Sequence, residues 1–298
     1  DSRFGRLRHW LTALAGRCDF ALSSTSRMRD IAAAYAPALP VHVLNDPAER
    51  IDTTVLGASA DARVAEARAS RRLTVAWFGI GDNPNFPVGL ADLAAWAGEL
   101  DRLRGRGFEV RLAILTNRRA MTPALLAGLR RLATPWTLAE WSESAERELL
   151  ARSTLVFLPV NAQGFSVVKS QNRVVTALCA GCQVLSAGFP LYAPFAPWLY
   201  RDAAGLVRDF ERGACRVSTA TAAALGQQLD TLANPAREAA ALAAFLAELS
   251  PAPAHDGPVA VIHGHDAHGD AHKFAQRLGA LSVAGPLATA HLNVDVRI

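Results

Sequence analysis

Short apolar runs alternate with amphipathic stretches along most of the chain. The runs have the length and the branched or aromatic composition of buried strands, and the stretches between them repeat apolar residues at helical spacing. The predicted strands lie at residues 19–23, 40–44, 73–78, 108–115, 136–141, 154–158, 183–186 and 259–262. The predicted helices lie at 26–35, 87–103, 122–132, 142–151, 170–180, 218–249 (with a break near Pro235) and 272–278. This alternation predicts an α/β fold in which helices flank a parallel, Rossmann-like sheet.

Changes in composition divide this pattern into three parts. Residues 48–70 are polar and rich in alanine without strand character, which favours a crossover linker, and Pro251-Ala-Pro253 marks a second linker. We therefore expect residues 1–52 to be the end of a preceding domain and a crossover, and residues 53–250 to form one Rossmann-like domain. Residues 251–298 would be a linker and the start of a further α/β unit. Since the chain does not begin with Met, we expect upstream sequence.

Composition narrows the classes of function. Hydrophobic residues make up 51% of the chain and charged residues 19%, which excludes disorder of the whole. The net charge of +4 comes from Arg rather than Lys; it suits a small anionic ligand and is too weak to indicate nucleic acid. No apolar run is long enough to be a transmembrane segment, and no secretory signal opens the sequence, so we expect a cytoplasmic protein.

The four cysteines are Cys18, Cys179, Cys182 and Cys215. Cys179 and Cys182 have C-x-x-C spacing, but a redox pair is expected at a helix start after a strand. Here the pair surrounds Gly181 at the far end of a predicted helix, so we interpret both as small buried residues in a reducing compartment.

The segment Lys169-Ser170-Gln171-Asn172-Arg173 carries the main chemical signal. Ser170 is a suitable N-cap for the helix that follows, and Gly181 is a suitable stop. The first-turn N–H groups of such a helix have no intrahelical partner and lie at the positive end of the helix dipole, where a phosphate binds readily.

Two cations at the positive end of a helix oppose the dipole unless an anion joins them. Arg173 can hold a phosphate through two parallel hydrogen bonds, and Lys169 supplies a point charge. The segment also follows the predicted strand 154–158, and open α/β sheets bind ligands at the carboxyl ends of their strands. The alternative is that both cations only form ion pairs with nearby acids.

Three motifs in order resemble the C-terminal, donor-binding domain of GT-B-fold glycosyltransferases, in a divergent form of glycosyltransferase family 4. They are Lys-Ser-x-Asn-Arg at 169–173, Ala-Leu-x-Ala-Gly-x-x-Val at 177–184, and Gly-x-Pro-x-Tyr at 188–192. Residues 19–24 and 41–47 resemble the segment in which these chains cross between domains. Residues 77–81, Trp-Phe-Gly-Ile-Gly, resemble the first strand and glycine loop of the donor domain. The resemblance covers roughly residues 18–215.

Such enzymes bind a nucleotide-sugar between two Rossmann-like domains and pass the sugar to an acceptor, which would be a glycan, lipid or protein. The resemblance implies that Lys169 and Arg173 hold the diphosphate with help from Ser170 and Asn172. Gly79 and Gly81 would let the backbone approach the ligand. The remaining residues assigned to the donor site are Asp82, Asn83, Gly164 and Phe165. The resemblance requires no cofactor and no metal.

One departure from the family pattern concerns the ribose of the nucleotide. Many of these transferases carry a Glu five residues before the helix-ending Gly, and here that position is Thr176. A second Glu of the preceding loop is also absent, with Val168 and Lys169 in its region. The chain is therefore either a divergent enzyme or a non-catalytic GT-B-like module that binds a nucleotide, a glycan or a partner protein.

Other candidates carry weaker signals. The loop from His263 to His272 partly matches the ligand motif of metal-dependent hydrolases, but Asp266 and Ala267 break the order of the ligands. Gly79 and Gly81 lack the third glycine of a dinucleotide fingerprint. Asp82 and Asn83 would either face the ligand or cap the next helix. Trp141, at a strand end, is a candidate neighbour of a nucleobase.

Overall fold

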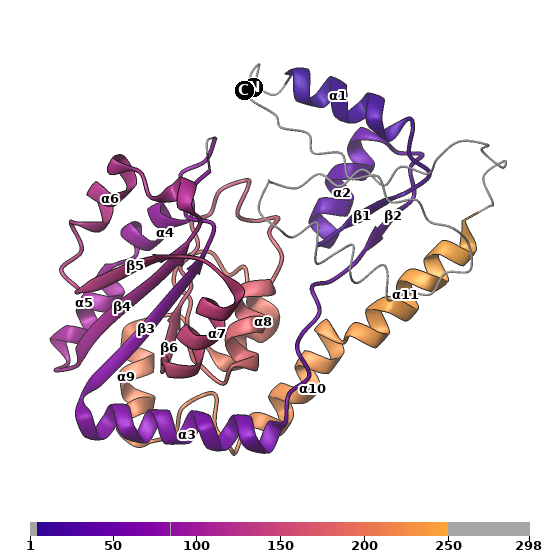
Figure 1. The fold of residues 1–298 in the computed structure, drawn as a ribbon. Helices are drawn as coiled ribbons and strands as arrows, with labels where there is room; N and C mark the ends of the chain where they lie inside the picture. Colours follow the sequence, from indigo (N-terminus) through magenta and orange to yellow (C-terminus); the bar gives the residue numbers. More distant parts are fainter. Residues whose placement is uncertain (1–4, 84, 250–298) are drawn as a thin grey trace. The chain divides into compact units, whose positions relative to one another are not determined.

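The computed structural model describes residues 5–83 and 85–249 of the chain (Figure 1). Its centre is a six-stranded parallel sheet in the order β5-β4-β3-β6-β7-β8. The strands are β3 (Arg72–Gly79), β4 (Glu109–Thr116), β5 (Trp136–Glu140), β6 (Leu155–Phe157), β7 (Gln183–Leu185) and β8 (Leu199–Tyr200). This sheet confirms the predicted α/β, Rossmann-like fold class.

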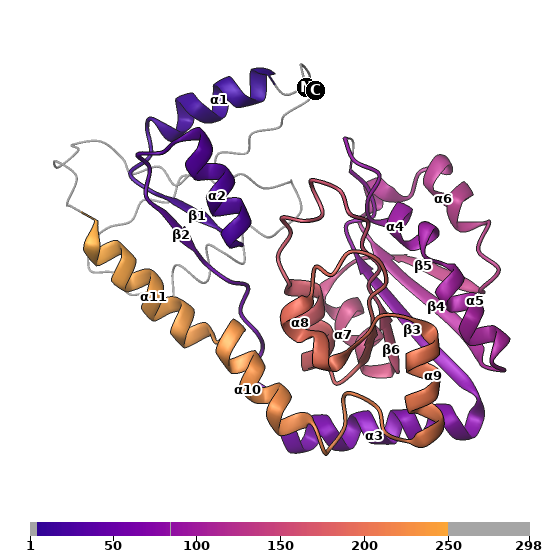
Figure 2. The ribbon, with the colours of Figure 1, turned by 180° about the vertical axis from the view of Figure 1, so that it is seen from behind.

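Helices cover both faces of the sheet (Figures 1 and 2). They are α3 (Thr53–Ser70), α4 (Leu90–Ala95), α5 (Gly98–Gly105), α6 (Pro123–Leu129), α7 (Glu143–Arg152), α8 (Asn172–Cys179), α9 (Ala203–Arg212) and α10 (Ala222–Ala233). Helix α11 (Pro235–Glu248) follows α10 and contributes no residue to either core of the sheet. Two short 3-10 helices, η2 (Arg118–Ala120) and η3 (Ala193–Trp198), lie in connections.

Alternation along β3 builds two cores. Ala76 and Phe78 pack with α7, α8 and α10, whereas Val75 and Trp77 point to the other face and pack with α4, α5, α6 and α9. All four side chains are buried, as expected for a central strand of a parallel sheet covered on both faces. Helix α3 supplies residues to both cores, and both views show it lying across the lower edge of the sheet.

The connections reverse direction at β3. After β3 the chain adds β4 and then β5 on one side; it then returns to the other side of β3 with β6 and continues to β7 and β8. The crevice at the carboxyl ends of β3 and β6 is therefore the topological switch point, where open α/β sheets bind their ligands.

The sequence interpretation was wrong for residues 48–70. Residues 53–70 form the long helix α3, with Asp52 as its N-cap accepting from the N–H groups of Thr54 and Val55. Its buried residues, Leu56, Ala60, Val64 and Ala67, follow helical spacing. They are mostly small, so the apolar stripe along the helix is narrow. The sequence alone did not reveal it as a helix face, whereas the packing on the sheet does.

Two further expectations need correction, and one segment was missed. The predicted helix 87–103 is two helices, α4 and α5, separated at Trp96 and Ala97. Helix α8 begins at Asn172 and not at Ser170. The segment from η3 through β8 to α9 was not predicted, because β8 is only two residues long and prolines interrupt the residues before it.

The first part of the chain contains a separate two-stranded parallel sheet. Strands β1 (Ala21–Ser23) and β2 (Val41–Val43) are joined by α2 (Ser26–Tyr35), and α1 (Gly5–Ala15) precedes them. Phe245 of α11 stacks on His42 of β2 at 4.9 Å between ring centroids. These strands and α2 confirm the elements predicted there; the domain boundaries after residues 52 and 250 stay predictions.

The chain divides into two units, Asp1–Leu246 and Ala247–Ile298. The predicted strand 259–262, the helix 272–278 and the His263–His272 loop lie outside the described residues. Among the helices that are described, none is both long and apolar enough to cross a membrane.

Helix α3 packs closely on the segment before α10, and this contact generates a prediction. A Cβ atom at Gly57 would lie 2.7 Å from the Cα of Thr219, which is backbone and cannot rotate away. We expect Gly57→Ala to lower the free energy of unfolding by about 1–3 kcal/mol, measured by urea denaturation.

Gly128→Ala in α6 is the matched control, because nothing lies within 4 Å of its added methyl group. The control should be neutral or stabilising by up to about 1 kcal/mol. Equal stability of the two variants would show that α3 does not pack as described.

Candidate functional site

Two loops meet at the switch point, residues 80–89 after β3 and residues 158–171 after β6. The side chain of Gln163 donates to the carbonyl of Pro87 at 3.0 Å. The N–H of Asn161 donates to the carboxylate of Asp92 at 3.1 Å, and the indole of Trp96 donates to the Asn161 side chain at 3.0 Å. These bonds fix the loop after β6 against the loop after β3.

Gly79 and Arg173, predicted from separate motifs, lie against each other. Gly79 ends β3 with a φ of +143°, and a Cβ atom there would be 3.2 Å from both Cδ and Nη1 of Arg173. The guanidinium also lies 3.5 Å from the carbonyl oxygen of Phe78. The missing side chain at Gly79 therefore leaves the room that Arg173 occupies at the end of the strand.

The start of α8 has donors without acceptors. Gln171 occupies the N-cap position with φ −97° and ψ 10°, and no side chain caps the helix. The predicted cap at Ser170 is wrong, because a capping side chain needs an extended residue directly before the first helical one. The Arg173 N–H bonds to the Asn172 side chain at 2.7 Å. Within the described residues, the N–H groups of Asn172 and Val174 have no acceptor.

Lys169 is a half-buried cation that forms no ion pair with any residue the structure describes. Its Nζ lies 4.7 Å from the centroid of the Phe165 ring. Burial, together with a smaller repulsion from Arg173, lowers the pKa of Lys169 to about 8 against the opposing attraction of Asp92. Among the described residues, neither Lys169 nor Arg173 has a carboxylate within 4.0 Å, so none of the described acids forms the ion pairs of that alternative.

Gly81, Asp82 and Asn83 shape the loop after β3. The Gly81 N–H donates to Asn117 at 2.9 Å, and a Cβ atom at Gly81 would lie 2.3 Å from the Thr116 hydroxyl. Asp82 accepts from Asn117 and from Arg119, at 2.9 and 2.8 Å. Burial alone would raise the pKa of Asp82, but these hydrogen bonds outweigh it and hold the pKa below its usual value.

Asn83 caps neither α4 nor any other helix, since its side chain accepts from the N–H groups of Asn85 and Phe86 in a local turn. Gly164 is exposed, with nothing near its Cα on which a Cβ would press. The indole N–H of Trp141 donates to Glu146, and its ring packs against the core that contains α8. Its proximity to a nucleobase stays a prediction.

Several contributors to this site gave no signal in the sequence. Asp92 is 3% exposed and bonds the N–H groups of Gly89 and Asn161. Phe86 stacks on Phe165 with ring centroids 5.4 Å apart. Asn117 holds both Gly81 and Asp82. Each of these acts across more than twenty residues or through a loop conformation, which no local pattern encodes.

Cys179 and Cys182 are unpaired thiols at the end of α8, as predicted. Burial raises the pKa of Cys179 to about 11 and also raises that of Cys182, so neither is a ready thiolate. In the part of the chain that the structure describes, no three His, Cys, Asp or Glu residues gather in a way that could hold a metal ion.

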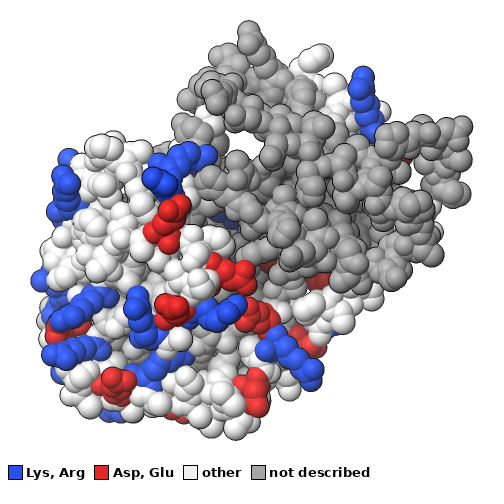
Figure 3. All heavy atoms as spheres, viewed as in Figure 1, with Lys and Arg blue, Asp and Glu red and all other residues white. Residues whose placement is uncertain are grey.

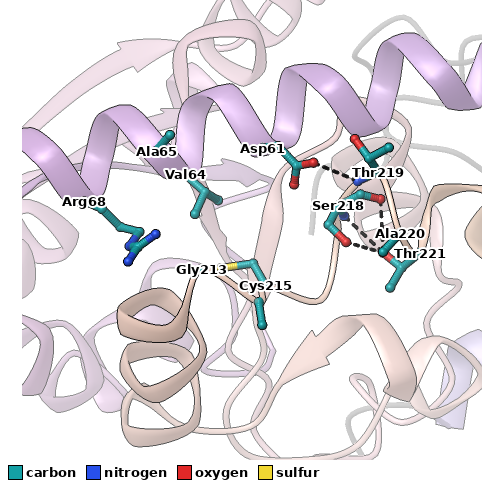
Figure 4. A pocket seen from close by; sticks show the side chains of 11 residues that line it. Asp61, Val64, Ala65, Arg68, Gly213, Cys215, Ser218, Thr219, Ala220 and Thr221 are labelled. Carbon is teal, nitrogen blue, oxygen red and sulfur yellow. Dashed lines mark hydrogen bonds between the residues drawn. The ribbon is translucent and has the colours of Figure 1, made fainter.

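A groove of about 690 Å³ lies elsewhere, between α3 and residues 213–221 (Figure 4). Asp61 accepts from the N–H of Thr219 at 3.1 Å, and Arg68 donates to the carbonyl of Glu211 at 2.9 Å. Burial raises the pKa of Cys215 in this groove to about 12. Its charged groups are thus used to hold the loop, and none of the predicted site residues lines it.

The surface drawn in Figure 3 mixes Lys and Arg with Asp and Glu. On the part of this face that is not grey, blue and red side chains are interspersed without a separate basic track. A local pair of cations suits a small anion better than a polymer of phosphates.

No family model matches the chain, and no curated protein matches it in sequence. Solved structures do match its fold. A UDP-forming α,α-trehalose-phosphate synthase from Burkholderia xenovorans has 13% identity and a TM-score of 0.50, covering 81% of this chain and 64% of that one. A structure of such a synthase from the same organism in complex with glucose-6-phosphate has 12% identity and a TM-score of 0.50, with 82% and 63% covered.

Trehalose-6-phosphate synthase OtsA has 11% identity and a TM-score of 0.51, and the match covers 84% of this chain and 63% of that one. The chain thus spans less than two thirds of the length of each of these structures. At such identities the likeness establishes a fold, which is the Rossmann-like arrangement of GT-B proteins.

The buried cation at Lys169 generates a prediction about stability and pH. Its pKa of about 8 in the folded chain lies below the ordinary 10.5, so the unfolded chain keeps this proton where the folded chain loses it. The cost of the buried charge is fully present below pH 8 and is relieved as the pH rises to 10.5. We expect Lys169→Met to stabilise the protein by about 1–3 kcal/mol at pH 7, and this gain to shrink above pH 8.

Denaturant unfolding at several pH values measures the difference. Arg147→Met on the exposed face of α7 removes the same charge and should change stability by less than about 0.5 kcal/mol at every pH. A Lys169→Met variant less stable than the parent at pH 7 would contradict the description of an unpaired buried cation.

Proposed function

We propose that this protein is a glycosyltransferase that binds a nucleotide-sugar with its diphosphate at the start of α8. One observation carries the proposal: among the residues that the structure describes, Lys169 and Arg173 have no ionic partner and lie beside N–H groups without an acceptor, at the switch point of the sheet. The resemblance of the 169–192 motifs to donor-binding domains and the GT-B-like fold support it.

A bound diphosphate would offset the repulsion between Lys169 and Arg173 and would supply acceptors for the N–H groups at the start of α8. Its oxygens would accept from the N–H groups of Asn172 and Val174 and complement the helix dipole. The Arg173 guanidinium would bind through paired hydrogen bonds, and Lys169 would gain an opposite charge. Ser170 and Asn172 would assist with their polar side chains, and Gly164 and Phe165 would form the outer loop.

In the proposed reaction, the bond from the sugar C1 to the diphosphate oxygen breaks and an acceptor hydroxyl bonds to C1. The hydroxyl proton leaves with a base, and the electron pair of the broken bond stays on the diphosphate. Lys169, Arg173 and the α8 N–H groups would stabilise that developing charge, so the step uses no metal and no cofactor. Gly79, Gly81, Asp82 and Asn83 would keep the loop close to the ligand.

The names of the structural neighbours suggest the class of donor. Those proteins are UDP-forming synthases, and one of them was solved with glucose-6-phosphate. We therefore propose a nucleoside diphosphate sugar as donor and a sugar or other hydroxyl compound as acceptor. The finer likeness to glycosyltransferase family 4 stays a prediction.

A second candidate is a non-catalytic GT-B-like module that binds a nucleotide. Thr176 favours it, because in the enzymes that the motifs resemble a Glu at this position holds the ribose. Thr176 lies in α8, half-buried, and offers only a hydroxyl. Binding without turnover of any donor would support this second candidate.

Binding of UDP and GDP to the whole chain, measured by calorimetry, tests the proposal. We expect Arg173→Ala to weaken binding by about tenfold to a hundredfold, because it removes charged hydrogen bonds worth about 1.5–3 kcal/mol. Arg147→Ala should change the Kd less than about twofold, since its ion pair with Glu143 is exposed.

Hydrolysis of UDP-sugars and GDP-sugars then separates the two candidates. Turnover that is lost in Arg173→Ala supports the enzyme, whereas tight binding with no turnover supports the module. If the parent binds neither nucleotide, or if Arg147→Ala and Arg173→Ala behave alike, the proposed site is wrong.

A further inference from the structure

Two aromatic rings join the loops of the candidate site. Phe86, in the loop after β3, stacks on Phe165, in the loop after β6, with an angle of 12° between their planes. The Lys169 ammonium lies over the Phe165 ring, 4.7 Å from its centroid. A cation within about 6 Å of a ring centroid is attracted to the ring face. The stack therefore ends on Lys169, one of the two cations of the site that have no carboxylate partner among the described residues.

Two other environments compete for the Lys169 ammonium: the carboxylate of Asp92 and solvent. The buried carboxylate of Asp92 attracts it, although both Asp92 oxygens already accept N–H groups, from Gly89 at 2.9 Å and Asn161 at 3.1 Å. Solvent attracts it as well, and Arg173 of α8 repels it. A lysine stem is flexible and its ammonium is strongly hydrated, so some group has to keep this one within the site. Phe165 is the group in contact with it.

The amino-acid composition of the chain also bears on the presence of a lysine at position 169. The sequence has 31 Lys and Arg residues, and only two of them, Lys169 and Lys273, are lysines. Lysine stands at the buried position where a compact cation is required. An arginine, with its wide planar head, already fills the neighbouring space at Gly79.

We propose that Phe165, supported by Phe86, is a positioning residue that holds the Lys169 ammonium where the diphosphate binds and away from Asp92. This inference rests on the proposed function for the identity of the ligand. Phe165 acts through Lys169 and not by stacking on a nucleobase. Removing its ring releases the ammonium to Asp92 or to solvent, and the bound anion loses one of its cations.

A double-mutant cycle with inorganic pyrophosphate and UDP tests this on the whole chain. We expect Phe165→Leu to raise the Kd of both probes by about threefold to tenfold, and Phe86→Leu to raise both by less. Phe165→Tyr should bind as the parent does. In a Lys169→Met background, Phe165→Leu should change neither Kd.

A Phe165→Leu effect confined to UDP would overturn the proposal, because pyrophosphate has no base to stack. An effect that persists in the Lys169→Met background would also overturn it. Phe245→Leu is the matched control: Phe245 is half-buried in another aromatic stack, against His42, and its loss should leave both Kd values unchanged. Thermal unfolding of each variant verifies that it is folded.

A second measurement needs no ligand. Protein labelled at lysine with ¹³C gives two Cε signals, which Lys273→Arg assigns. We expect the pKa of Lys169 to rise from about 8 in the parent to a higher value in Phe165→Leu, since the ammonium then reaches Asp92 or water. It should not move in Phe245→Leu. An unchanged pKa in Phe165→Leu would overturn the positioning role.

The two measurements separate the two proposals. If the parent binds neither probe, the proposed function fails, and the lysine titration alone decides whether Phe165 positions Lys169. If the parent binds both probes and the titration and the cycle show no effect of Phe165→Leu, the proposed function stands and the positioning role is wrong.

Discussion

Strand β6 pairs with β3 over only two pairs of residues, Val75 with Leu155 and Ala76 with Val156. This pairing determines that β6, β7 and β8 lie on the side of β3 opposite to β4 and β5. Because β6 returns to the other side of β3, the two loops meet at the carboxyl ends of these strands, and the chain then continues from one loop toward β4 and from the other toward β7. The space between them receives the end of β3 at Gly79 and the start of α8 with Arg173. Without that crossover the two motifs would have no reason to meet.

The charges gathered at this site are unfavourable for the stability of the folded chain. Lys169 and Arg173 repel each other at the positive end of a helix, and burial lowers the pKa of the lysine to about 8. Proteins tolerate such arrangements where a ligand compensates for them. The hydrogen bonds that Asp92 and Asn117 accept, from the N–H groups of Asn161, Gly89 and Gly81, hold the two loops beside these cations in place. The two cations and the hydrogen-bonded loops around them therefore belong to one site.

The comparisons with solved structures establish the fold and give no further information about the site. Structures of the same fold share only 11–13% of their residues with this chain, and no family model matches it. A fold of this kind accommodates many chemistries, so function has to be argued from the site. Within the described residues, this site offers two cations without a carboxylate partner, N–H groups of α8 without an acceptor, and Thr176 in place of a carboxylate. The aromatic pair Phe86 and Phe165 adds a feature that motifs alone would not reveal.

The sequence by itself determined the elements whose signals are local. The buried strands, the helices predicted to begin at residues 122 and 142, the stop at Gly181 and the clustering of Lys169 with Arg173 were all predictable, because each depends on neighbouring residues. Only the tertiary structure decided that residues 53–70 are a helix, that Gln171 replaces Ser170 at the cap, and that Phe86 meets Phe165. These depend on contacts between residues distant in sequence, whose energies no local pattern records.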